Sequence, residues 1–142
     1  MQVNVHRLDP KVSLPTPAHP GDAGLDLAAA ETVSIRPGER AAVSTGIAVE
    51  IPVGYAGLVI PRSGHARRQG ITLVNSPGLI DPGYRGEIQV LLINHGDEVV
   101  QFDKGDRIAQ LIIVGVPSVT WEEVIELGDS PRGDKGFGST GR

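Results

Sequence analysis

Residues 75–90 read NSPGLIDPGYRGEIQV. Pro82-Gly83 is a strong turn signal with apolar residues on both sides, which predicts two β-strands joined as a hairpin. Asp81 stands directly before this turn and Tyr84 directly after it. An Asp before Pro-Gly is often only a turn former, and Tyr84 could be only a half-buried aromatic. The glycines that bracket both residues favour a second interpretation, in which the backbone comes close enough to hydrogen-bond the edge of a flat base.

The rest of the chain continues this β-pattern. Turn signals such as Arg36-Pro37-Gly38 separate short runs of β-branched residues. We expect strands at 3–8, 32–35, 41–51, 55–60, 71–74, 87–93, 98–102, 107–114 and 118–127. One helix is expected at 63–69, with Ser63 as its cap and Gly70 as its terminator. No connection carries a crossover helix, so the pattern predicts an all-β sandwich or jelly roll and excludes parallel βαβ units.

Composition narrows the possible classes of protein. The chain has 142 residues with 39% apolar content, enough for one domain with its own core. We expect no membrane span and no secretory signal, because no apolar run is long enough. The lack of cysteines removes disulfides and thiolate chemistry and mildly favours a cytoplasmic location. A net charge of −4 argues against a nucleic-acid binder, although 10 of the 13 basic residues are arginines, which suit phosphate contacts.

Two short segments carry groups that suit phosphate or metal. The segment IPRSGHA places Arg62 and Ser63 where a strand ends and the helix begins, and helix N-termini attract anions. Ser63 could equally serve only as a cap, with Arg62 paired to a surface acid. The segment GDAGLDL carries Asp22 and Asp26, which on a strand would share one face. Such carboxylates hold Mg²⁺ together with substrate phosphates, although solvent-facing loop acids are the plainer interpretation.

Two later segments are also informative. KGDRIAQL places Arg107 and Gln110 at the start of a strongly apolar strand, where the polar Gln110 side chain needs a partner. Residues 128–142 read GDSPRGDKGFGSTGR, which is either a frayed tail or a glycine-rich flap that orders over an anion. Phe137 is unusual in a purely solvated tail and favours the flap.

In this order the segments resemble the five motifs of trimeric dUTP pyrophosphatases. They are DAGLDL, PRSG, GLIDPGYRGE, GDRIAQL and RGDKGFGSTG, and they span residues 22–141. The third and fifth are specific, whereas the first and fourth are weak alone. The resemblance implies a distorted jelly-roll (β-clip) homotrimer, with 1–127 as the catalytic domain. It implies that 128–142 form a flexible arm closing a neighbouring subunit's active site.

The resemblance also implies an activity and a role for each site residue. The activity is hydrolysis of dUTP to dUMP and pyrophosphate by water attack on the α-phosphorus, which limits uracil in DNA and supplies dUMP for dTMP synthesis. Asp81 would bind the 3′-hydroxyl and activate the water. Asn75, with backbone groups of Gly78, Ile80 and Tyr84, would read the uracil edge and refuse cytosine. Tyr84 would also exclude UTP by packing where a 2′-hydroxyl would lie.

The remaining implied roles concern the phosphates. The phosphate chain and the attacking water would be held by Arg62, Ser63, Gly64 and Gln110. Asp26 would contact Mg²⁺ through water, with the metal carried by the substrate phosphates. From a neighbouring subunit, Phe137 would stack on uracil. The γ-phosphate would be closed off by Arg132, Gly138, Ser139 and Thr140.

Some positions depart from the family pattern. His65 follows Ser63-Gly64 where many members have an aliphatic residue, and we expect it to be a helix surface residue rather than a general base. The other histidines lack metal-ligand spacing. We interpret Asp22 as structural. The tail carries Asp134-Lys135 where glycine or alanine is more usual.

Two rival functions fit the sequence less well. A dCTP deaminase has a related fold and the Ile-Asp-Pro-Gly-aromatic turn, but needs a glutamate on the following strand. Here that strand reads IQVLLI after Glu87, without an acid. A non-catalytic nucleotide-binding relative should have lost Asp81 or the C-terminal motif, and both are present.

Overall fold

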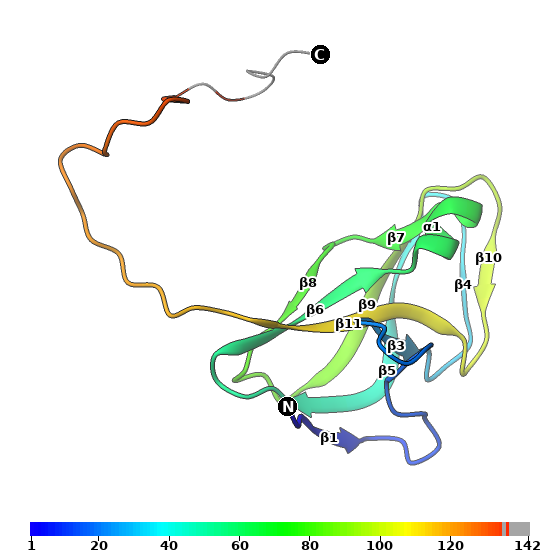
Figure 1. Ribbon diagram of the computed structural model, residues 1–142. Helices are drawn as coiled ribbons and strands as arrows, with labels where there is room; N and C mark the ends of the chain where they lie inside the picture. Colours follow the sequence, from blue (N-terminus) through cyan, green and yellow to red (C-terminus); the bar gives the residue numbers. More distant parts are fainter. Residues whose placement is uncertain (135, 137–142) are drawn as a thin grey trace.

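Antiparallel strands form most of the regular secondary structure, with one short helix among the described residues (Figure 1). The computed structural model describes residues 1–134 and 136. The elements are β1 Asn4–Arg7, β2 Thr16–Pro17, β3 Leu25–Ala28, β4 Val33–Ile35, β5 Arg40–Glu50, β6 Tyr55–Pro61, α1 Ser63–Gln69, β7 Ile71–Leu73, β8 Gly78–Ile80, β9 Glu87–Asn94, β10 Val100–Phe102 and β11 Arg107–Gly115.

The described strands pair into three sheets around one core. Their orders are β1-β5-β9-β7, β2-β3-β11-β6-β8 and β10-β4. Along β9, Ile88, Val90 and Leu92 are fully buried, whereas Gln89 between them is exposed. This period of two is what the pleat of a strand imposes on a sheet with one face in the core. Residues of all three sheets, such as Ile35 and Ile108, belong to the same apolar cluster.

The expected all-β class and most of the expected strands are confirmed. The eight strands expected before residue 115 are all present, with ends within two residues of the predicted ones. The sequence missed β2 and β3. They are short, and Pro17 in β2 removes a backbone donor, which restricts a strand to the edge of a sheet.

The strand expected at 118–127 is wrong. After β11 the chain leaves the sheets and runs away from them (Figure 1), and residues 118–127 form no strand. Their pattern is apolar, yet Trp121 is 95% exposed and Ile125 is fully exposed. A β-strand needs a neighbouring strand for its backbone groups, and this segment pairs with no described strand of its own chain.

The hairpin expected within 75–90 is also wrong, although both strands exist. β8 pairs with β6, whereas β9 pairs with β5 and β7, so the two strands belong to different sheets. The turn at Pro82-Gly83 therefore carries the chain from one sheet to the other.

The helix has the predicted bounds but a different cap. Gly70 ends α1 with φ 68°, the left-handed conformation that favours glycine. At the other end the N-cap residue is Arg62, not Ser63, and it makes no side-chain capping bond. Arg62 keeps extended dihedrals because it continues directly from β6, so Ser63 is already the first helical residue.

Candidate functional site

Three neighbouring strands bring distant polar residues together. Asp26 on β3 lies opposite Gln110 on β11, and β11 pairs on its other side with β6. Arg62 directly follows β6, and Arg107 begins β11. The central position of β11 thus joins residues that lie up to 84 positions apart in the chain.

The side chains of these residues form a hydrogen-bonded group, which we call the Asp26 cluster (Asp26, Arg62, Arg107 and Gln110). Arg62 Nε donates to Asp26 Oδ1 over 3.2 Å, and Arg107 Nη1 donates to Oδ2 over 3.2 Å. Gln110 Nε2 donates to Oδ1 over 3.3 Å, which confirms that Gln110 needs a partner. Two guanidiniums against one carboxylate leave a surplus of positive charge, which suits a polyanion such as a phosphate chain.

The Asp26 cluster is closely packed around Asp26 and open to solvent at Arg107. The Asp26 side chain is only 7% exposed, whereas that of Arg107 is 55% exposed. A Cβ on Gly24 would come within 2.9 Å of Gln110 Nε2, so this glycine leaves the space that the Gln110 amide occupies. A groove of about 370 Å³ runs beside the cluster, and both Asp26 and Arg107 line it. The guanidinium of Arg107 can therefore reach a ligand from solvent.

The cluster suits a metal only through water. Asp26 is its one acid, and three donors already occupy a carboxylate that offers about four acceptor positions. No group of three or more His, Cys, Asp or Glu side chains suited to a metal is present among the described residues. Asp22, the second carboxylate of that segment, is structural as expected, because its Oδ2 accepts from the backbone N–H of His19 over 3.0 Å.

The second region is the segment 81–86, which we call the Asp81 turn. Tyr84 N–H donates to the Asp81 carbonyl over 3.0 Å, closing the turn. Arg85 Nη1 donates to the carbonyls of Pro82 and Tyr84, and its Nη2 pairs with Glu50 over 3.0 Å. The Asp81 side chain is exposed, and its carboxylate has no partner within the described part of the chain. Arg85 thus stabilises the turn, and the Asp81 carboxylate remains available to a ligand.

The predicted base-reading residues gather beside this turn. Asn75 is exposed, and its Nδ2 lies 3.2 Å from the position that a Cβ on Gly78 would take. The Asn75 amide therefore packs closely over Gly78, which has no side chain. The Tyr84 hydroxyl donates to the Glu87 carbonyl over 2.9 Å. A Cβ on Gly86 would overlap this hydroxyl, so Gly86 is needed for Tyr84 to lie as it does.

Within a single chain, the Asp26 cluster and the Asp81 turn lie far apart. Gly57 on β6 pairs with Ile80, which places the following Asp81 level with Ala56, whereas Gln110 pairs with Ile60. Four residues of strand separate these levels by about 13 Å, and β6 lies between β8 and β11. The Gln110 amide points toward Asp26 on β3, away from β8.

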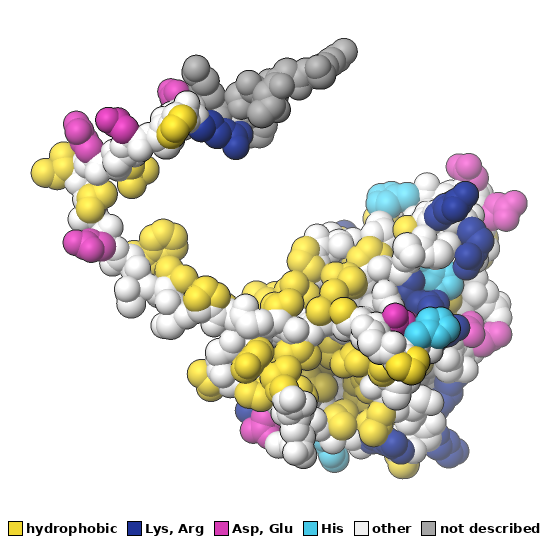
Figure 2. Space-filling model, viewed as in Figure 1, with side chains coloured by type: hydrophobic (Ala, Val, Ile, Leu, Met, Phe, Trp, Pro, Cys, Tyr) yellow, Lys and Arg dark blue, Asp and Glu magenta, His cyan; other side chains and the backbone are white. Residues whose placement is uncertain are grey.

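The predicted arm is only partly within the described residues. Arg132 lies in a turn at 131–134, where Gly133 N–H donates to Ser130 Oγ over 3.0 Å. The predicted arm residues Phe137, Gly138, Ser139 and Thr140 lie outside the described residues. Before the turn, apolar side chains of the tail are exposed, and Figure 2 shows further hydrophobic side chains gathered on the face that the tail leaves.

Sequence reasoning missed two residues that the structure connects to the site. Arg107 was noted as the start of a strand, but its ion pair with Asp26 was not expected. His65 was expected on the helix surface, but it is half-buried and hydrogen-bonded. Asp26 and Arg107 carry opposite charges and both lie in recognised segments. This match of charges could have indicated their ion pair.

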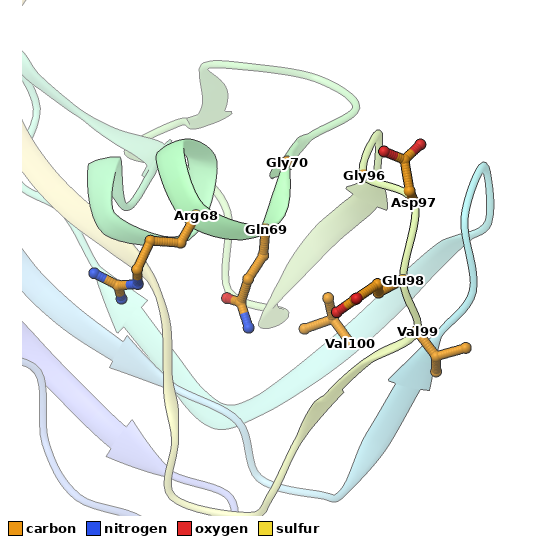
Figure 3. Close-up of a pocket in the computed structure, with 8 residues that line it drawn as sticks. All are labelled: Arg68, Gln69, Gly70, Gly96, Asp97, Glu98, Val99 and Val100. Atoms are coloured by element: carbon orange, nitrogen blue, oxygen red, sulfur yellow. The ribbon is translucent and has the colours of Figure 1, made fainter.

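A separate groove of about 410 Å³ lies between the C-terminal end of α1 and the β9–β10 connection (Figure 3). Its lining includes Arg68, Asp97 and Glu98. In Figure 3 the Arg68 side chain points away from Asp97 and Glu98, so the charged groups do not converge on one point. None of the predicted site residues lines this groove.

Comparison with known proteins assigns the arrangement to a family. A family model of dUTPases matches residues 10–141. The chain belongs to the dUTPase family. It is 56% identical to the deoxyuridine 5′-triphosphate nucleotidohydrolase of Thermobifida fusca, over 99% of this chain and 79% of that protein. It is also 56% identical to that of Gloeobacter violaceus, over 99% of this chain and 97% of that protein.

Solved dUTPase structures share the fold. The dUTPase of Staphylococcus bacteriophage 80alpha, solved with dUPNHPP, superposes with a TM-score of 0.91 at 32% identity, covering 99% of each chain. A variant of the dUTPase of phage phi11 of S. aureus, described with a structural Mg(II) ion, gives a TM-score of 0.83 at 29% identity over 89% of this chain and 98% of that one. The expected family and jelly-roll-like fold are confirmed. Within the described residues, no helix is long and apolar enough to cross a membrane.

Proposed function

We propose that this protein hydrolyses dUTP to dUMP and pyrophosphate, with water attacking the α-phosphorus. The available carboxylate of Asp81 carries the proposal, because the turn around it is braced by Arg85 while the acid itself is exposed and without a partner in the described chain. A carboxylate in this state can orient a water molecule and accept its proton. Family membership over residues 10–141 supports the choice of dUTP.

The Asp81 turn suits recognition of the nucleoside. Asn75 and the backbone around Gly78 and Ile80 would hydrogen-bond the uracil edge. Cytosine presents the opposite pattern of donors and acceptors, and a mismatch in such a site is strongly penalised. Tyr84 is held by its hydroxyl bond to Glu87, so its ring would form a fixed wall against a 2′-hydroxyl.

The Asp26 cluster suits the phosphates. Arg62 and Gln110, with Ser63 and Gly64 at the start of α1, would hold the phosphate chain and the attacking water. Asp26 would contact Mg²⁺ through water, with the metal bound directly by the substrate. The ion would neutralise charge on the triphosphate. We place the enzyme in the cytoplasm, together with its nucleotide substrate.

We also propose that each active site is shared between copies of a homotrimer. Two side chains that contact one water molecule lie within about 6 Å of each other, because each hydrogen bond spans about 3 Å. Asp81 and Gln110 of one chain are about 13 Å apart along β6, which is farther than this. A complete site therefore needs Asp81 from one copy and the Asp26 cluster from another, and the arm 128–142 would close it from a further copy.

Product analysis tests the reaction. The protein is incubated with dUTP, dCTP, UTP and dTTP, with and without Mg²⁺, and the products are separated. We expect pyrophosphate and dUMP from dUTP alone, and faster with Mg²⁺. Release of ammonia from dCTP would instead favour the deaminase.

The structure gives a further argument against that deaminase. Glu87 is the acid nearest to the strand position that a deaminase needs. Its Oε1 accepts from the Gly46 N–H over 2.8 Å, and its Oε2 accepts from Ser44 Oγ over 3.4 Å. Glu87 is thus taken up in holding the irregular part of β5 rather than left for water activation.

Mixed assemblies test whether sites are shared. Asp81→Ala and Gln110→Ala proteins are unfolded together in equal amounts and refolded. If a site takes these two residues from different copies, about a quarter of the sites receive both intact residues, so activity returns to roughly that fraction of wild type. If both residues come from one copy, the mixture stays as inactive as the separate variants.

Removal of the arm tests its role. Deletion of residues 133–142 should reduce turnover strongly and leave the assembly folded, since the core lies within the earlier strands. Wild-type turnover after this deletion would contradict the flap interpretation.

A further inference from the structure

His65 joins α1 to the first residue of β11. Its Nε2 lies 2.9 Å from the Arg107 carbonyl oxygen, and its Nδ1 lies 2.9 Å from Gln69 Oε1. The ring also packs edge-on against Phe102, with centroids 5.0 Å apart and planes at 85°. Phe102 is 2% exposed, so one side of the imidazole rests on the core. A residue held on three sides in this way has a defined position.

Arg107 connects this contact to the phosphate-binding residues. Its carbonyl, the acceptor for His65, also lies 3.4 Å from Nη1 of Arg62, and its guanidinium pairs with Asp26. The backbone and the side chain of one residue therefore link α1 with the Asp26 cluster. His65 follows Ser63 by two positions and Gly64 by one, so its bond fixes the turn that carries both.

The geometry excludes His65 as a general base. A carbonyl oxygen only accepts hydrogen bonds, so Nε2 carries the proton in the bond to Arg107. The other nitrogen faces the Gln69 amide, which can turn either its oxygen or its NH₂ group toward the ring. The bond to Arg107 thus persists whether the imidazole is neutral or charged, and neither nitrogen is left for the substrate.

We propose that His65 is a positioning residue, which through the Arg107 carbonyl fixes Arg62, Ser63 and Gly64 for binding of the β- and γ-phosphates. This inference rests on the proposed function. His65 contacts Gln69, Arg107 and Phe102 and, among the described residues, no residue of the Asp81 turn. Since that turn would bind the nucleoside, the effect of His65 is confined to ligands with a phosphate chain.

Binding measurements on the full-length protein test the proposal. His65→Leu keeps an apolar side chain of similar size but removes the donor. His65→Gln retains an N–H donor at nearly the position of Nε2. Gln69→Leu removes only the Nδ1 contact and is the control on the same helix. Calorimetry gives the affinity for a non-hydrolysable imido analogue of dUTP and for dUMP, and thermal melts give Tm.

We expect His65→Leu to weaken binding of the dUTP analogue about tenfold, because small misplacements of binding groups carry costs of this order. Its affinity for dUMP should change less than about twofold, and its kcat/KM for dUTP should fall with the analogue affinity. His65→Gln should restore analogue binding to within about threefold of wild type, and Gln69→Leu should match wild type.

Three results would overturn the inference. They are wild-type analogue affinity in His65→Leu, an equal loss for dUMP and analogue together with a lowered Tm, and no rescue by His65→Gln. If His65→Leu does not fold, His65→Met takes its place with the same expectations. Failure of the wild-type protein to bind either nucleotide would instead contradict the proposed function and leave a different pattern, because no variant would then differ from it.

Discussion

The two acids of the proposed site, Asp26 and Asp81, stand in opposite surroundings. Asp26 lies on a strand, is nearly buried, and accepts hydrogen bonds from two arginines and a glutamine. Asp81 lies in an exposed turn, and in the described chain nothing engages its carboxylate. An acid whose acceptor positions are mostly occupied holds other groups in place, whereas an acid with free acceptor positions can take part in chemistry. The groups proposed to hold the phosphates and to activate water thus lie at different levels of β6.

Removal of the available acid gives the largest expected effect. Asp81→Ala should lower turnover of dUTP by about 10³-fold, within the range that a general base contributes, and leave Tm and analogue binding nearly unchanged. Pyrophosphate release measures turnover, thermal melts measure Tm, and calorimetry measures analogue binding. Asp97→Ala is the matched control, since Asp97 is an exposed acid in another connection. Near-normal turnover of Asp81→Ala would remove the contrast between the two acids.

Removal of Asp26, the acid that is already hydrogen-bonded, should lower stability as well as activity. Asp26→Ala leaves the guanidiniums of Arg62 and Arg107 facing each other without their shared partner. We expect turnover to fall about tenfold to a hundredfold, and the free energy of unfolding to fall by about 1–3 kcal/mol, because the arginine heads are partly exposed and solvent screens them. Denaturant titration measures the second quantity. An unchanged midpoint would show that Asp26 does not hold the cluster together.

A change beside Tyr84 should alter selectivity more than rate. Gly86→Ala places a methyl group where the Tyr84 hydroxyl lies, so the ring must move from its bond to Glu87. We expect the ratio of kcat/KM for dUTP over UTP to fall about tenfold. Competition assays with both nucleotides measure it. Unchanged discrimination would show that the position of Tyr84 does not set the preference for deoxyribose.

The smallest expected effect concerns the brace of the Asp81 turn. The Asn4 amide, and with it the Arg85 guanidinium, lowers the pKa of Glu50 below its ordinary value. This contribution to stability is present above the ordinary pKa of a glutamate and is lost as pH falls through the lowered one. Glu50→Gln should therefore change Tm slightly at neutral pH and not at strongly acidic pH, with turnover within about twofold of wild type. A Tm difference that grows toward acidic pH would contradict this sign.

The sequence predicted local features well. Gly70 ends the helix because glycine adopts the left-handed conformation, and the strand 87–94 follows from its run of β-branched and other apolar residues. Both properties lie within a few neighbouring residues. The motifs that carry Asp26, Arg62, Asp81 and Gln110 could be recognised for the same reason.

Properties that depend on distant segments could not be predicted in this way. The turn at Pro82-Gly83 has the sequence of a hairpin, but the partners of β8 and β9 are set by strands elsewhere in the chain. The Asp26–Arg107 ion pair joins residues 81 positions apart, and no local pattern fixes such a contact. The apolar residues of 118–127 resemble a strand, but a strand forms only where a partner edge is available.

The tail also gives the protein a spectroscopic reporter. Trp121 is the single tryptophan of the chain, and its side chain is 95% exposed. Its fluorescence emission should therefore resemble that of indole in water and be quenched readily by iodide when the tail is bare. Contact of the tail with a neighbouring copy would shift the emission to shorter wavelength and protect it from the quencher. Dilution of the unlabelled native protein then reads out assembly directly, without any substitution.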